Sequence, residues 1–136
     1  MVDTVSAITR SRIMASIKGK DTTPEIMLRK ALSVKGYKYR KNYHIGRKTI
    51  DIAFVGRKVA VLVDGCFWHG CPRHHKLPKS NLEYWKMKIM ANVKRDSITD
   101  YELKAEGWHV IRIWEHDLRD NTAMCVSRVE RLAKLI

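Results

Sequence analysis

The stretch from residue 59 to residue 75, VAVLVDGCFWHGCPRHH, constrains the fold of this chain more than any other. Its apolar run from Val59 to Val63 predicts a strand buried on both faces, and the run ends in Asp64 followed by Gly65. After Gly65 come a further glycine and a proline among cysteines, histidines and a Phe-Trp pair, so neither a strand nor a helix is expected to continue. Metal-binding side chains and large rings at this density indicate a loop with a chemical function.

Hydrophobic periodicity and turn residues predict the elements on either side of this stretch. Thr22 or Thr23 is expected to cap one helix, with Glu25 as a capping-box partner whose presence capping alone explains. Ser80 and Glu83 are expected to form the capping box of a long helix. In chain order the patterns predict a short basic helix over 9–17, a helix over 21–36, strands over 37–43, 49–54 and 58–64, a long helix over 80–106, a strand over 108–114 and a last helix capped by Asn121.

The order of these elements predicts an α/β fold. Three consecutive strands joined by short turns favour an antiparallel meander. A strand that follows a long helix is expected to pair parallel to one of them, which gives a mixed central sheet flanked by helices. At 136 residues the chain is expected to form one domain over its whole length, 1–136.

The charge balance indicates a polyanionic partner. Lys and Arg number 27 against 14 Asp and Glu, a formal net charge of +13 that is spread along the chain. Nucleic acid fits such a field, although a basic protein kept soluble by its charge, or one associated with ribosomes, has the same composition. Without an apolar segment of membrane-spanning length or an N-terminal signal pattern, no membrane contact and a cytoplasmic location are expected.

Two acidic residues lie in neighbouring strands. By alternation Asp51 shares a sheet face with Thr49 and Ala53, opposite Ile50 and Ile52, and a turn at Gly56 brings it to the region of Asp64. Two carboxylates beside a phosphodiester favour a Mg²⁺ ion between them. The alternative is that Asp51 is an ordinary solvated acid on the outer face of the sheet.

A second pair consists of His69 and Asp96. Asp96 lies on the same stripe of the long helix as Ile89 and Val93, so it is expected to point inward, where a buried acid needs a partner. It could fix the tautomer of His69 as a general acid or base. A salt bridge to a basic residue, such as Arg112 or one of the neighbours of Arg95, is the alternative.

Cysteines and histidines in the central loop predict a tetrahedral Zn²⁺ site. Cys66, Cys71 and His74 have suitable spacing, and His116, just after the strand WHVIRIW, is the best-placed fourth ligand. His75 is an alternative to His74. Cys125 fits the apolar face of the last helix instead.

Aromatic residues flank these ligands. Phe67 and Trp68 lie between Cys66 and Cys71, so the loop is expected to hold both rings outward on a basic protein, where they could stack between bases. Trp85 could join them from the long helix. Covering the metal site as a small satellite core is the alternative, and for Trp85 it is the preferred one on pattern alone.

Four blocks of the chain resemble a known family. TRSRIMASIKGKDTTPE, GCFWHGCPRH, YWKMKIMANVKRD and LKAEGWHVIRIWE are similar, in this order, to the very-short-patch-repair (Vsr) DNA mismatch endonucleases, over residues 9–118. The resemblance implies a restriction-endonuclease-like core with a structural zinc. It also implies a DNA endonuclease that nicks one strand 5′ to the thymine of a T:G mismatch left by deamination of 5-methylcytosine.

The resemblance also implies roles for individual residues. Asp51 and the backbone carbonyl of Val63 would bind Mg²⁺, and His69 would be the general acid or base, supported by Asp96. The rings of Phe67, Trp68 and Trp85 would insert beside the mismatch. Residues 1–20 would form a basic DNA-contacting segment, with Met14 as a wedge from the other groove and its basic residues at Arg10, Arg12, Lys18 and Lys20. The partner would be double-stranded DNA with a T:G mismatch, other mismatch-repair proteins are candidate partners, and a monomer suffices for a single nick.

One departure concerns the end of the strand over 58–64. Restriction-type nucleases place an acid and a lysine there, whereas this chain has Leu62, Val63 and Asp64. Some members of the family have a histidine where Asp64 stands, so the resemblance implies either a second metal ligand or a proton carrier on the phosphate side. Two other functions remain as alternatives: a restriction-like nuclease with a different DNA target, and a non-catalytic zinc module that binds nucleic acid.

Overall fold

The computed structural model describes residues 22–66 and 80–135 of the chain. The basic helix expected over 9–17 and most of the central loop lie outside these residues. In chain order the described elements are α2 (Thr23–Val34), β1 (Arg40–Ile45), β2 (Lys48–Phe54), the 3₁₀ turn η1 (Val55–Arg57), β3 (Val59–Asp64), α3 (Leu82–Ala105), β4 (His109–Trp114), α4 (Glu115–Asp120) and α5 (Thr122–Leu132).

The four strands form one mixed sheet in the order β1-β2-β3-β4. β1 pairs antiparallel with β2, and β2 pairs antiparallel with β3, which confirms the predicted meander. β4 pairs parallel with β3, in a register that joins Val59 to His109 and Asp64 to Trp114. The predicted mixed sheet is therefore confirmed, and the carboxyl ends of β3 and β4 lie side by side.

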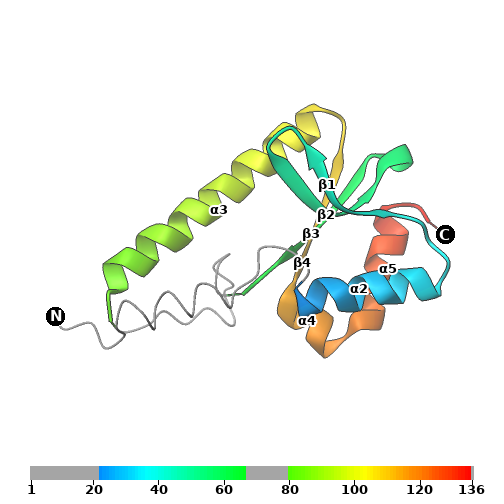
Figure 1. Cartoon of the computed structure of the whole chain (residues 1–136), viewed down its shortest axis with the longest axis horizontal. Coiled ribbons are helices and arrows are strands. Elements are labelled where there is room, and N and C mark those ends of the chain that lie inside the picture. Colours follow the sequence, from blue (N-terminus) through cyan, green and yellow to red (C-terminus); the bar gives the residue numbers. More distant parts are fainter. Residues whose placement is uncertain (1–21, 67–79, 136) are drawn as a thin grey trace.

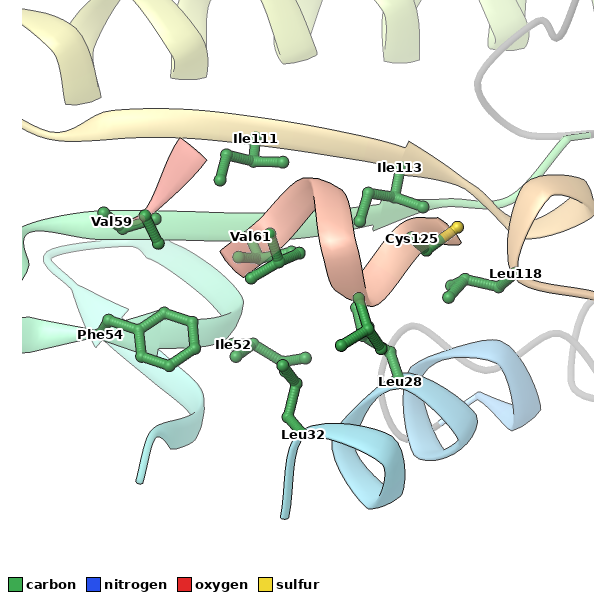
Figure 2. Close-up of a cluster of buried hydrophobic side chains, with 13 residues drawn as sticks. Leu28, Leu32, Ile52, Phe54, Val59, Val61, Ile111, Ile113, Leu118 and Cys125 are labelled. Carbon is green, nitrogen blue, oxygen red and sulfur yellow. The ribbon is translucent and has the colours of Figure 1, made fainter. Parts of the chain in front are cut away.

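Helices cover both faces of this sheet (Figure 1). On one face, α2, α4 and α5 pack against apolar side chains of β2, β3 and β4, and Figure 2 shows Leu28 and Leu32 of α2 pointing toward Ile52 and Val61. On the other face, Leu103 of α3 packs in a smaller cluster with the sheet residues Ile50, Ala53, Ala60, Leu62 and Trp108. The long helix and the three short ones thus lie on opposite sides of the sheet.

The helix ends show which of the predicted capping residues are correct. Thr22 caps α2, and Asn121 caps α5 through its side-chain oxygen, which accepts from the N–H of Met124 at 3.0 Å. Gly107 follows α3 with a φ of +88°, as expected of a helix-ending glycine. The capping box of Ser80 and Glu83 is wrong, because α3 begins after Asn81, whose left-handed backbone carries no side-chain cap hydrogen bond.

The short helix α4 was not predicted, because its six residues are too few to show a period. None of the helices within the described residues is long and apolar enough to span a membrane.

Candidate active site

The acid predicted in the second strand lies where the pairing of β2 with β3 ends. Their backbone register runs from Phe54–Val59 to Ile52–Val61. One residue further along β2, Oδ2 of Asp51 accepts a hydrogen bond of 2.7 Å from the N–H of Val63. In a strand the N–H and C=O of one residue point to the same side, so the carbonyl of Val63 faces the side of Asp51 as well.

The strand does not keep simple alternation at this point. Ile50 packs in the cluster beneath α3 together with Ala53, whereas Ile52 packs on the opposite face. The expectation that Ile50 and Ile52 share a face is therefore wrong. The neighbouring strand is irregular at the same level, because Asn42, between the partners of Ile52 and Ile50, has a left-handed φ of +48°. Such irregularities turn a side chain out of its regular direction, and here Asp51 turns toward β3.

A third carboxylate, Glu25 of α2, joins this site. Its backbone N–H donates to Oγ1 of Thr22 at 3.4 Å, as capping predicted, but the residue is only 3% exposed and its charge acts on Asp51. Capping alone therefore does not explain Glu25. A signal was present in the sequence, because Glu25 is three and seven residues before the core residues Leu28 and Leu32 and so shares their helix face.

The environment of Asp51 changes its acidity. Burial raises the pKa of Asp51 to about 7, and the negative charges of Glu25 and Asp64 act in the same direction. The hydrogen bond from Val63 and the positive charge of Arg112 act in the opposite direction. A carboxyl group with this pKa is half protonated at neutral pH, and a nearby cation would ionise it.

Asp64, at the end of β3, pairs with Arg112 of β4. Nη1 of Arg112 donates to Oδ1 of Asp64 at 2.7 Å, and the side chain of Asp64 is 8% exposed. The same guanidinium contacts two acids of α3. It binds both oxygens of the Asp100 carboxylate, and it lies 3.8 Å from Oδ1 of Asp96. The alternative of a salt bridge between Asp96 and Arg112 is thus confirmed, whereas His69 lies outside the described residues.

Two of the four predicted zinc ligands lie together. Sγ of Cys66 is 3.2 Å from Nδ1 of His116, and Nε2 of that ring lies 3.3 Å from Oδ1 of Asp117. The N–H of Cys66 also donates to Oε1 of Glu115 at 2.8 Å. Cys71 and His74 lie outside the described residues, and no three His, Cys, Asp or Glu side chains within 22–66 and 80–135 form a group that could hold a metal ion.

The aromatic and basic residues predicted to contact DNA fall mostly outside the description. Trp85 is described and is 6% exposed, with its ring 5.0 Å from that of Tyr84 in an edge-on arrangement. Its insertion into DNA stays a prediction, and in this structure the ring is buried. The other predicted contacts lie outside the described residues: Arg10, Arg12, Met14, Lys18, Lys20, Phe67 and Trp68.

Comparison with known proteins identifies relatives along most of the chain. A family model described as DNA mismatch endonuclease Vsr matches residues 2–75. The type II nicking enzyme V.NaeI of Lentzea aerocolonigenes is 44% identical over 129 residues, which are 90% of this chain and 78% of that enzyme. The DNA mismatch endonuclease Vsr of Escherichia coli (strain K12) is 32% identical over 123 residues, 88% of this chain and 77% of that protein.

A solved structure supports the fold. The catalytic domain of the homing endonuclease I-Bth0305I superimposes with a TM-score of 0.57 over 82% of this chain and 94% of that domain, at 20% sequence identity. The likeness concerns the architecture alone, and it agrees with the expected mixed central sheet flanked by helices.

Proposed function

The chain belongs to the Vsr family of DNA mismatch endonucleases, and from this premise we propose that it nicks one strand of duplex DNA 5′ to the thymine of a T:G mismatch, with Mg²⁺ as catalytic cation. Its relatives are endonucleases, so the alternative of a non-catalytic nucleic-acid-binding module is wrong. The observation that carries the proposal is the half-buried carboxylate of Asp51 beside the backbone of Val63 at the end of the paired sheet.

The residues at this position fit a Mg²⁺ ion. Mg²⁺ prefers oxygen ligands and takes few of them from protein, usually one or two carboxylates. Asp51 and the carbonyl of Val63 would hold it, and the charges of Glu25 and Asp64 make the surroundings negative. Bound there, the cation would supply positive charge to a phosphoryl oxygen and lower the pKa of a water molecule.

The chain's own groups would carry the remaining tasks. The hydrogen bond from Val63 holds Oδ2 of Asp51 in place, and Oδ1 would be the oxygen offered to the cation. His69 would move the proton of the attacking water or of the leaving oxygen, and Asp96 would orient its ring. Glu25, buried beside Asp51, would keep that carboxyl group basic enough to exchange a proton for a cation near neutral pH.

The DNA-contacting residues remain part of the proposal. Residues 1–20 would lie along the duplex within a single domain of 1–136, and Met14, Phe67 and Trp68 would enter the base stack. Unstacking costs roughly a few kcal/mol per step and is least at a mispair, which would contribute to selection of the T:G site. One active site suffices for one nick, so a monomer is proposed.

A structural Zn²⁺ site at Cys66, Cys71, His74 and His116 is also proposed. The support comes from Cys66 and His116, whose ligand atoms lie 3.2 Å apart. Two such ligands of a tetrahedral zinc ion would be about 3.6 Å apart, from its usual bond lengths. The contact of His116 with Asp117 resembles the carboxylate that commonly orients a zinc-binding histidine.

A nicking assay tests the proposal. A duplex with one T:G mismatch, labelled on the thymine strand, is expected to be nicked 5′ to the thymine with Mg²⁺ and to stay intact without it. Asp51→Ala should lower the rate by a factor of at least about 10³, because the metal ligand is lost. Asp120→Ala, which removes an exposed acid of α4, is the matched control and should nick at the wild-type rate.

Equal activity of Asp51→Ala and wild type would remove Asp51 from the mechanism. Because several relatives are named only as type II nicking enzymes, the assay includes matched and branched duplexes. If matched DNA is nicked as fast as the T:G duplex, the protein is a nicking enzyme with another target.

A further inference from the structure

Arg112 connects the end of β3 to the long helix α3 through one guanidinium group. Nη1 donates to Asp64 at 2.7 Å, Nε donates to Asp100 at 2.9 Å, and Nη2 donates to Asp100 at 2.7 Å. Nη2 also contacts the backbone carbonyl of Asp96 at 3.5 Å. All three nitrogens of the group are therefore engaged, and its side chain is 21% exposed.

From these contacts we infer that Arg112 is a positioning residue of the nuclease site, which holds Asp64 as an anchor between β3 and α3 rather than as a metal ligand. This inference rests on the proposed function, because the distance it fixes separates Asp51 and Val63 from Asp96. The parallel pairing of β3 with β4 places Leu62 opposite Arg112, so the guanidinium starts from the strand next to the site.

The charges explain why an arginine stands here. Asp64, Asp96 and Asp100 gather around one guanidinium group, and the charges of Asp64 and Glu25 also act on Asp51. Like charges this close repel one another unless a cation lies among them. Only a planar fork with several donors can bind three acids of two different elements at once, and a lysine ammonium offers no such geometry.

These contacts explain the role of Asp64 and the absence of a lysine at the end of β3. A carboxylate that accepts a 2.7 Å bond from arginine already has a positive partner, so it attracts a metal ion less than a carboxylate without one. Restriction-type nucleases carry a lysine at the end of the third strand itself. Here the positive charge comes from Arg112 on the neighbouring strand, β4. Arg112 fixes the position of β3 relative to α3, because its N–H donors face protein carboxylates.

The test compares Arg112→Met and Arg112→Lys with the wild type in single-turnover nicking, alongside DNA affinity and urea unfolding. Arg112→Met is expected to lower the nicking rate at saturating DNA about 100-fold, the size of effect caused by a displacement of about 1 Å, while the Kd for DNA changes less than about threefold. Arg112→Lys should recover part of the rate, since it keeps one contact. Arg131→Met, at an exposed position of α5, is the matched control.

Second variants keep the test decisive if Arg112→Met fails to fold. The double variant Asp64→Asn with Arg112→Met removes the negative charge that Arg112 compensates, and it should fold and still nick about 100-fold slower than wild type. Asp100→Asn removes the anchor on α3 alone and should lower the rate by a smaller factor. Wild-type rates in the folded Arg112 variants would overturn the inference, and so would a loss confined to DNA affinity.

The outcome is separable from that of the proposed function. If the wild type nicks matched DNA as fast as the T:G duplex, mismatch specificity fails, and the same variants are then compared on matched DNA. If the T:G duplex is preferred but the variants nick normally, only the role of Arg112 fails.

Discussion

At the scale of single residues, the acidity of Asp51 links the stability of the protein to its chemistry. The pKa of Asp51 is raised to about 7 from a usual value near 4, first by burial and then by Glu25. Between these two values the folded protein binds a proton that the unfolded chain releases. Its contribution to stability is therefore complete at low pH and is lost as the pH rises toward 7.

This linkage predicts how the free energy of unfolding depends on pH. Without added Mg²⁺, Asp51 should lower the stability of the wild type by about 2–4 kcal/mol between pH 4 and pH 7, with no further change from this group above pH 8. Asp51→Asn should lack this contribution and be more stable than the wild type at pH 8. Urea unfolding at intervals of one pH unit measures the free energy of unfolding of both proteins.

The control for that series is Asp120→Asn, which removes an exposed acid and should keep the wild-type pH dependence. Added Mg²⁺ should stabilise the wild type more at pH 8 than at pH 6, because the ion competes with the proton for Asp51. If Asp51→Asn and the wild type show the same pH dependence, the carboxyl group is not in the environment described.

At the scale of elements, the ends of β3 and β4 are held together beyond their last backbone pair. Glu115 begins α4 directly after β4, and its carboxylate accepts the N–H of Cys66, two residues after the end of β3. The bond fixes the point from which the central loop departs, next to both the nuclease site and the proposed zinc ligands. A short helix that the sequence pattern did not reveal thus holds the residue from which the loop with the proposed His69 departs.

Removal of this bond should cost stability. Glu115→Ala leaves the N–H of Cys66 without its carboxylate partner and should lower the free energy of unfolding by about 1–3 kcal/mol. Glu115→Gln keeps an acceptor oxygen and should lose less. Thermal or urea unfolding followed by circular dichroism gives both values.

Glu115 has a second contact, because its Oε2 lies 3.5 Å from Nη2 of Arg119, whose side chain is 59% exposed. Arg119→Ala is the control for this contact. Because exposed ion pairs contribute little, this variant should change stability by less than about 1 kcal/mol. Equal losses in Glu115→Ala and Arg119→Ala would assign the effect to the ion pair rather than to Cys66.

At the scale of the whole molecule, the charge of +13 coexists with a local gathering of acids. Asp64, Asp96 and Asp100 surround Arg112 at one end of the sheet, and the charges of Glu25 and Asp64 act on Asp51 nearby. In the proposed function, the positive net charge would attract the DNA, and the acidic centre would receive the phosphate through a divalent cation. The two charge patterns serve different steps.

This division predicts strong salt dependence of binding and weak salt dependence of chemistry. The affinity of Asp51→Ala for duplex DNA should fall linearly on a log–log plot as NaCl rises from 50 to 200 mM, by roughly 10³-fold if about six phosphates are contacted. Fluorescence anisotropy measures it. Single-turnover nicking of saturated wild type should change far less, and an affinity independent of salt would contradict the electrostatic role of the surface.

The sequence by itself determined the local features of this protein. The apolar run before Asp64 indicated the buried strand, and three strands with short turns indicated the meander. Thr22, Asn121 and Gly107 marked helix ends correctly, because caps act over only a few residues. Family membership followed from short blocks in a fixed order.

Only the tertiary structure decided which distant residues meet. Glu25 reaches Asp51 because α2 packs on the sheet, and Arg112 reaches Asp64 and Asp100 because β4 lies beside β3 and beneath α3. Ile50 and Ile52, on either side of Asp51, pack on opposite faces of the sheet, and this likewise depends on a left-handed residue of another strand, Asn42. Periodicity reports which side of an element is apolar, but strand register and helix packing set the distances between charges, and these arise from contacts far apart in the chain.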